Sequence, residues 1–210
     1  MTRSVSACNL PPAVDMNVLE AIRARRAIRA YSSRVVDEET VRALLNAAVQ
    51  APSAINEQLW IFAVVQDVRQ LARWSERAKR LLLEQAAADP KARRYNPRLV
   101  DPQFNVFYDA STLVVIGSRE RGQYTDADCW LAAENLMLAA CDAGLGSCPI
   151  GLSVPLLNQP DIKEELRFPS FAAVVAPIIV GYPSAPAAAV PRAAAQILSW
   201  SKAASEQRRE

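Results

Sequence analysis

Apolar residues recur at helical spacing early in the chain, behind side chains that can cap a helix. Asp15 or Asn17 can begin a first helix, which runs on into the arginine-rich stretch 23–31. Asp37 can begin a second helix, and Pro52 would end it. The apolar positions are Val18, Leu19 and Ile22 on the first helix, and Val41, Leu44, Leu45 and Ala48 on the second.

Short apolar runs rich in β-forming residues indicate strands at 60–66 and 111–117. Residues 68–87, between them, have a helical pattern with Leu71, Trp74, Ala78, Leu81 and Leu82 on one side. Residues 88–105 carry three prolines and many polar groups. This composition predicts a long loop or lid, a type of segment that often borders a site.

A third helix is predicted after Thr125, which can cap it and pair with Asp128 in a capping box. Gly144 is suited to the C′ position that ends it. The helix is apolar on nearly every side and rich in alanine, so it should be buried on most of its surface. A dimer interface and a large monomeric core would each explain this.

The last third of the chain predicts a short helix within 153–166 and a strand region at 171–183. Pro177 disfavours a central, fully paired strand and favours a strand start, a bulge or an edge. An irregular arm is expected at 184–195 and a final short strand at 196–200. The order of elements indicates an α+β fold with a few-stranded sheet between helices. We expect one domain over 15–200, a flexible lead at 1–14 and a tail at 201–210.

Composition narrows the class of function. The formal net charge is +2, with 24 basic and 22 acidic residues, which favours neither nucleic acid nor a membrane as partner. No apolar run is long enough to cross a membrane, and the first residues do not resemble a secretory signal. The four cysteines form no C-x-x-C pair, so we expect no metal site and a reducing, cytoplasmic setting.

Histidine is absent, which excludes Ser-His-Asp and Cys-His mechanisms. An enzyme of this composition would depend on a cofactor for much of its chemistry. We therefore expect no catalytic side chain in the usual sense.

Four groups of residues could carry chemistry, although each also has an ordinary structural explanation. Arg25, Arg26 and Arg29 would be neighbours on one helix, where they could bind a phosphate or simply face solvent at the helix end. The loop Pro52–Gln58 could bind a polar ligand or serve as a connector. The stretch 144–151 could approach a ligand closely or form a helix cap and a turn. Arg192 alone is an ordinary surface arginine.

Taken together and in order, five segments resemble the nitroreductase family of FMN-dependent oxidoreductases. They read EAIRARRAIRAY, LLNAAVQAPSAINEQLWIFAVV, FYDASTLVVIG, DCWLAAENLMLAACDAGLGSCPIG and IIVGYP. The resemblance covers roughly residues 16–200 and implies a mainly antiparallel sheet flanked by helices. It also implies an intertwined homodimer with two FMN molecules at the interface, each touched by both subunits.

The resemblance assigns a role to each motif. Arg25 would bind the FMN phosphate, and Arg29 would lie near the N1/O2 edge of the flavin. Ala27 stands where the family has a serine, so one hydroxyl is lost, and Arg26 could compensate. Arg192 would complete the phosphate site, and Asn105 would bond the flavin pyrimidine.

The loop would reach the flavin held mainly by the other subunit, through Pro52, Ser53, Ala54, Asn56 and Gln58. The backbone of Pro149, Ile150, Gly151 and Leu152 would face the flavin. Pro149 has no N–H, so the donors to N5 or O4 would be Gly151 and Leu152.

The implied reaction is ping-pong. NAD(P)H would give a hydride to the flavin, and a nitroaromatic, quinone or enone would then take it. Two alternatives stay open: a substrate-specific dehydrogenase or dehalogenase with the same cofactor, and a flavin-binding protein without turnover.

Overall fold

The computed structural model describes residues 16–88 and 97–202. Its centre is an antiparallel sheet of four strands in the order β1-β2-β4-β3. The strands are β1 (Trp60–Val65), β2 (Thr112–Ser118), β3 (Gly146–Pro149) and β4 (Ala173–Gly181). This confirms the predicted α+β class and mainly antiparallel sheet. The predicted lead at 1–14 lies outside the described residues, and the division into lead, domain and tail stays a prediction.

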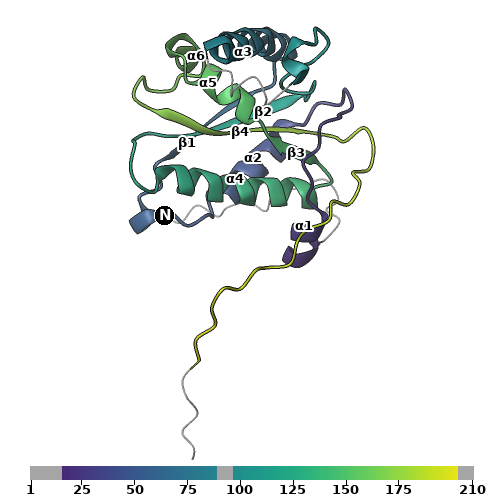
Figure 1. The fold of residues 1–210 in the computed structure, drawn as a ribbon, viewed down its shortest axis with the longest axis vertical. Coiled ribbons are helices and arrows are strands. Elements are labelled where there is room, and N and C mark those ends of the chain that lie inside the picture. Colours follow the sequence, from purple (N-terminus) through teal and green to yellow (C-terminus); the bar gives the residue numbers. More distant parts are fainter. Residues whose placement is uncertain (1–15, 89–96, 203–210) are drawn as a thin grey trace, which may run out of the picture.

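Helices cover both faces of the sheet (Figure 1). One face packs against α2 (Glu38–Ala48) and α4 (Thr125–Asp142). The other carries α3 (Val68–Ala88), α5 (Val154–Leu157) and α6 (Pro160–Glu165). A short α1 (Val18–Ala24) lies beside one end of α4. Single-turn 3₁₀ helices occur at Ala54–Asn56, Pro97–Val100 and Gly151–Ser153.

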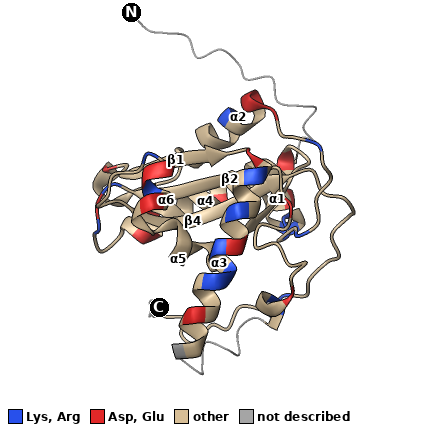
Figure 2. Ribbon diagram, turned by 90° about the horizontal axis from the view of Figure 1, so that it is seen from above, with Lys and Arg blue, Asp and Glu red and all other residues tan. Residues whose placement is uncertain are grey.

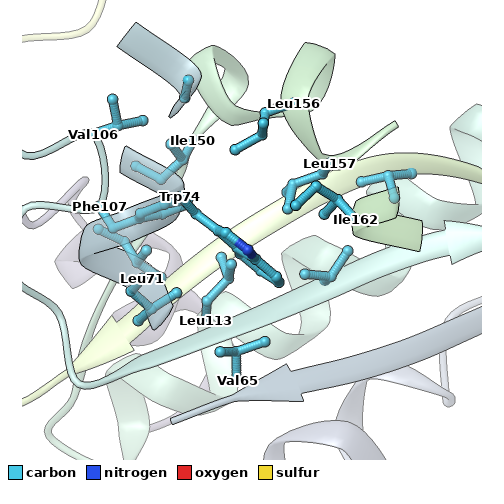
Figure 3. Packing of buried hydrophobic residues seen from close by; sticks show 14 of the residues in the cluster. Val65, Leu71, Trp74, Val106, Phe107, Leu113, Ile150, Leu156, Leu157 and Ile162 are labelled. Carbon is cyan, nitrogen blue, oxygen red and sulfur yellow. The ribbon is translucent and has the colours of Figure 1, made fainter. Parts of the chain in front are cut away.

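The cluster between α3 and the sheet is organised around Trp74, whose indole is surrounded by aliphatic side chains of α3, α5 and the strands (Figure 3). The indole N–H donates to Glu165 at 3.2 Å, so its polar atom is satisfied. Phe104 and Phe107 are buried in the same cluster. These three aromatic residues therefore belong to the core. Along α3, basic residues outnumber acidic ones (Figure 2).

Two caps follow the sequence closely. The Asp37 carboxylate accepts from the Thr40 N–H at 2.8 Å and begins α2 as predicted. Of the two candidates for α1, Asn17 is the cap, in a capping box with Glu20. Val18, Leu19 and Ile22 of α1 are more than half exposed within one chain.

The first helix does not continue through the arginines, contrary to the prediction. It ends at Ala24, and Arg25 has φ −54° and ψ 131°, which lies outside the helical region. The chain then runs extended along the sheet, where the Ile28 N–H donates to the Ser147 carbonyl at 3.0 Å. These tertiary hydrogen bonds replace the ones that further helical turns would have formed.

The start of α4 also differs from the prediction. Tyr124 occupies the N-cap position without a side-chain hydrogen bond, and Thr125 lies inside the helix and bonds Gly122. Asp128 forms no capping box, because its carboxylate accepts from the Ala54 N–H instead. The predicted end is confirmed, with Gly144 at φ 69° directly after the cap residue Ala143.

The C-terminal strands correct two expectations and confirm part of a third. β3 was not predicted, since Gly146–Pro149 looked like a turn. β4 lies in the middle of the sheet, which Pro177 was expected to disfavour, but the predicted bulge is present: the pairing with β2 shifts register between Ile116 and Gly117, and β3 pairs only as far as Ile178. Residues 196–200 form no strand. The irregular arm is confirmed, and it runs away from the domain with Val190, Ile197, Leu198 and Trp200 exposed (Figure 1).

Candidate functional site

The arginine segment and the glycine-rich segment, far apart in the sequence, meet on β3. Ala27 and Ser147 form a parallel bridge, and a Cβ at Gly146 would lie only 2.7 Å from Ile28. The missing side chain at Gly146 is therefore what lets the extended arginine segment lie against the strand. Two of the predicted ligand-binding motifs thus form one surface.

Arg25 and Arg26 are partly buried at this contact. The Arg25 Nε lies 3.3 Å from the Glu134 carboxylate, and Arg26 donates to the backbone carbonyls of Arg23 and Arg25. The Nε atoms of both arginines are buried and make no hydrogen bond within the described residues, although the Arg25 Nε has the Glu134 carboxylate as an ion-pair partner. A buried guanidinium N–H without an acceptor is costly, so the Arg26 position fits a site that a ligand oxygen completes.

A cavity of about 670 Å³ opens beside Arg26 and reaches the C-terminal arm, whereas Arg25 does not line it. Its charged lining residues are Arg26, Arg29, Arg98 and Arg192, and no carboxylate lines it among the residues that the structure describes. The cavity also runs along the arm residues Ala185–Ala188 and Val190. A cavity whose charged lining residues are all arginines favours an anion. A phosphate group matches the fork of donors that arginine presents.

A second cavity, of about 420 Å³, shares Arg29, Ala30, Arg98 and Tyr108 with the first. Asn105 lines it. Its amide already donates to Asp109 at 2.7 Å and accepts from the Phe107 N–H at 2.8 Å. Asn105 retains one amide hydrogen for a ligand.

Arg98 and Tyr108 are site residues that sequence reasoning missed. Arg98 lies on the 3₁₀ helix within the predicted loop or lid, and no motif marks it. Tyr108 has φ 52° and the next residue, Asp109, has φ 56°. Bulky residues rarely adopt this conformation, and only the fold discloses it.

The backbone after β3 presents open hydrogen-bond donors. The Ile150 N–H is already bonded to the Pro177 carbonyl at 2.9 Å, and Pro149 has none to offer. The N–H groups of Gly151 and Leu152 have no acceptor among the described residues. A Cβ at Gly151 would meet nothing within 4 Å, so space is open beside these donors.

The loop Pro52–Gln58 lies apart from this surface. It is held by Asp128, near the beginning of α4, through the Ala54 N–H at 3.2 Å. The N-terminal end of α1 contacts the other end of α4, where the Met16 N–H donates to Asp142. Asp128 and Asp142 are separated by about 21 Å along the helix axis at 1.5 Å per residue. Arg25 contacts the helix between these two ends, at Glu134, which is six residues or about 9 Å along the axis from Asp128. Within one chain, no residue of the loop lines either cavity beside the arginine segment.

The loop is nevertheless held in a defined shape. Ser53 Oγ accepts from the Gln58 N–H at 3.1 Å, and the Gln58 amide donates to Asn56 at 3.1 Å. Ile55, Asn56 and Gln58 have φ of 44°, 60° and 52°. The Ile55 side chain is 90% exposed. Strained backbone and an exposed apolar side chain are expected where a loop meets a partner or ligand.

Two titratable groups near the site, Cys148 and Tyr31, are buried or partly buried. Burial raises the pKa of the Cys148 thiol, and nearby Arg29 and Arg25 only partly oppose this. Burial also raises the pKa of the Tyr31 phenol. Neither group is suited to proton transfer near pH 7. Within the described residues no group of acidic or cysteine side chains could hold a metal ion, and no described helix is long and apolar enough to span a membrane.

The comparisons with known proteins agree with this geometry. A putative NADH dehydrogenase/NAD(P)H nitroreductase of Archaeoglobus fulgidus is 33% identical over 172 residues, 79% of this chain and 84% of that protein. An iodotyrosine deiodinase of Thermotoga neapolitana is 28% identical over 178 residues, 80% of this chain and 89% of that protein.

A crystal structure of a nitroreductase with bound FMN from Bacteroides fragilis superposes with a TM-score of 0.74 at 27% identity, over 89% of this chain and 98% of that one. The model of the nitroreductase family matches residues 22–182. The chain therefore belongs to the nitroreductase family.

Proposed function

We propose that this protein is an FMN-dependent oxidoreductase that uses NAD(P)H to reduce nitroaromatic, quinone or similar electron-poor acceptors. The observation that carries the proposal is the arginine-lined cavity. The backbone N–H groups of Gly151 and Leu152, which have no acceptor in the described part of the chain, lie just after β3, the strand on which the arginine segment lies, and they support it. The FMN bound to the Bacteroides fragilis relative supports it. When bound, FMN supplies the redox chemistry, by accepting a hydride from NAD(P)H and passing it to an acceptor in a ping-pong cycle.

The chain's own residues would bind and orient the cofactor. Arg25, Arg26 and Arg192 would hold the phosphate, and the buried Nε of Arg26, which lines the cavity, would gain an acceptor there. This arrangement could offset the hydroxyl that Ala27 lacks. Arg29 would face the flavin edge that becomes negative on reduction, and a cation there favours the reduced form. The N–H groups of Gly151 and Leu152 would donate to the opposite edge.

We further propose an intertwined homodimer in which the loop Pro52–Gln58 completes the partner's site. The position of the loop supports this, since within one chain its residues line neither cavity beside the arginine segment. Apolar side chains of α1 and of the arm lie exposed in a single chain and would be covered by a second copy. Disrupting the dimer should therefore release the cofactor.

The three cysteines within the described residues are free thiols, which supports a reducing, cytoplasmic setting.

The test is an absorption spectrum of protein purified without added flavin. We expect a yellow protein that anaerobic NADH or NADPH bleaches and that a nitroaromatic or quinone reoxidises. Failure to bind FMN would overturn the proposal. A bound flavin that neither nucleotide reduces would instead indicate a binding protein without turnover.

The similarity to an iodotyrosine deiodinase favours one second candidate, a reductive dehalogenase with the same cofactor. It predicts release of halide from a halogenated tyrosine by the reduced protein, faster than any nitro reduction. An ion-selective electrode measures that halide directly.

A further inference from the structure

The two cavities beside the arginine segment share a wall of four lining residues, and not all of them have a proposed contact with FMN. The shared residues are Arg29, Ala30, Arg98 and Tyr108. With Arg25, Arg26 and Arg192 assigned to the phosphate and Arg29 to the flavin edge, Arg98 and Tyr108 have no role in holding the cofactor. Both face a volume that continues past Asn105.

The chemistry of this wall combines a cation with an aromatic ring. The Tyr108 ring lies 5.5 Å from the Phe104 ring in an edge-to-face arrangement at 79°. The Arg29 guanidinium lies 5.9 Å from the centre of the same ring. The ring is thus fixed by a buried neighbour on one side and a cation on another, in a backbone conformation with φ 52°.

Charge restricts where an anion can lie. The smaller cavity also contains Asp101 and Asp109, whose carboxylates accept from the Gln103 N–H and from Asn105. An anion would be repelled from that end. The shared wall contains two arginines and no carboxylate, so an anion would be drawn to it. Arg98 is exposed there, at the rim, where an entering molecule could reach it.

We propose that Arg98 and Tyr108 form an acceptor subsite that selects planar aromatic acceptors carrying a carboxylate. Arg98 binds the carboxylate through its fork of donors, and the aromatic ring of the acceptor packs on Tyr108. For a nitrobenzoate, two electrons and one proton arrive as a hydride that originates from NAD(P)H. A second proton from water completes the reduction of the nitro group to a nitroso group and water. The subsite rests on the proposed function.

The experiment compares 4-nitrobenzoate with its neutral, nearly isosteric analogue 4-nitrobenzamide. The ratio of their kcat/KM values is measured for the wild type, Arg98→Ala, Arg98→Lys and the control Arg73→Ala. Arg73 is exposed on α3 and lines neither cavity, so the control makes the same change in net charge. Because intrinsic reactivity cancels between variants, a change in the ratio reports the carboxylate contact alone.

We expect Arg98→Ala to lower the preference for the carboxylate by about tenfold to a hundredfold, mostly through KM. Arg98→Lys should recover part of it, since lysine keeps the charge but not the fork. Arg73→Ala should leave it unchanged. Calorimetric titration with benzoate and benzamide gives a second readout without turnover, and Arg98→Ala should weaken only benzoate binding.

Three results would overturn the subsite. The first is equal loss for both acceptors in Arg98→Ala, and the second is a wild type that binds benzoate no better than benzamide. The third is weaker FMN binding in Arg98→Ala with unchanged riboflavin binding, which would assign Arg98 to the cofactor phosphate. Absence of nitro reduction in every protein, the wild type included, would count against the proposed function. The benzoate titration would still show whether Arg98 binds a carboxylate.

Discussion

Gly146 lies where the arginine segment crosses β3, and its replacement by alanine should disturb that contact. The new Cβ would lie 2.7 Å from Cβ and Cγ1 of Ile28 and 2.8 Å from Cγ2. Carbon atoms pack at about 3.5 Å or more, so the two segments must separate by about 0.8 Å. Overpacking of this kind costs about 1–3 kcal/mol.

Part of that cost is offset, because alanine loses less chain entropy than glycine on folding, by about 0.4–1 kcal/mol. We therefore expect Gly146→Ala to lower the free energy of unfolding by roughly 1–2 kcal/mol. FMN binding should weaken too, since the arginines are carried on the displaced segment. Ile28→Ala in the same chain should recover only part of the loss, because the Ile28 Cβ remains.

Gly151→Ala is the matched control. Its Cβ meets nothing within 4 Å and its φ is not positive, so stability should stay level or rise by up to about 1 kcal/mol. FMN affinity should nevertheless fall, because the methyl group would occupy the space assigned to the flavin. Urea unfolding of the apoprotein and titration with FMN measure the two effects separately. Unchanged stability in Gly146→Ala, or unchanged FMN binding in Gly151→Ala, would refute the reasoning.

Three further predictions concern single side chains. Arg25→Ala should release FMN, with Arg42→Ala as control because its ion pair with Glu38 lies on the surface; normal FMN affinity in Arg25→Ala would contradict the phosphate assignment. Asp128→Asn should destabilise the loop by about 1–2 kcal/mol, because it weakens the hydrogen bond from the Ala54 N–H. Proteolysis within 52–58 should then be faster than in the wild type, and equal cleavage rates in the two proteins would contradict this prediction. Burial raises the pKa of Cys129 to about 12 from 9.0, so the thiol contributes stability below pH 9 that is lost as pH rises toward 12. In urea unfolding at pH 8 to 11, the free energy of unfolding should therefore fall less steeply with pH in Cys129→Ala than in the wild type. Parallel curves for the two proteins would exclude this contribution.

The sequence was most informative where local chemistry decides the structure. Asp37 and Gly144 act within one turn of their helices, and their caps form as predicted. The α+β class followed from the order of apolar periodicities alone. The family motifs then marked three groups as candidate parts of one site: the arginine segment, the loop Pro52–Gln58 and the glycine-rich stretch 144–151. The structure brings the first and the third of these together on β3.

The errors arise where distant segments compete for the same backbone groups. Residues 25–29 have helical composition, yet pairing with β3 extends them. Asp128 was expected to serve its own helix and instead bonds Ala54, 74 residues away. Arg98 was invisible because its role depends on a cavity formed by segments from three parts of the chain.

A mixed dimer tests the central claim, that each cofactor site is built from two chains. One chain carries Arg25→Ala, and the other carries Asn56→Ala with Gln58→Ala, each with its own affinity tag. Either variant alone should retain no FMN. In the mixed dimer one site draws intact arginines from one chain and an intact loop from the other, so we predict about one FMN per two chains. A mixed dimer without FMN would contradict the account.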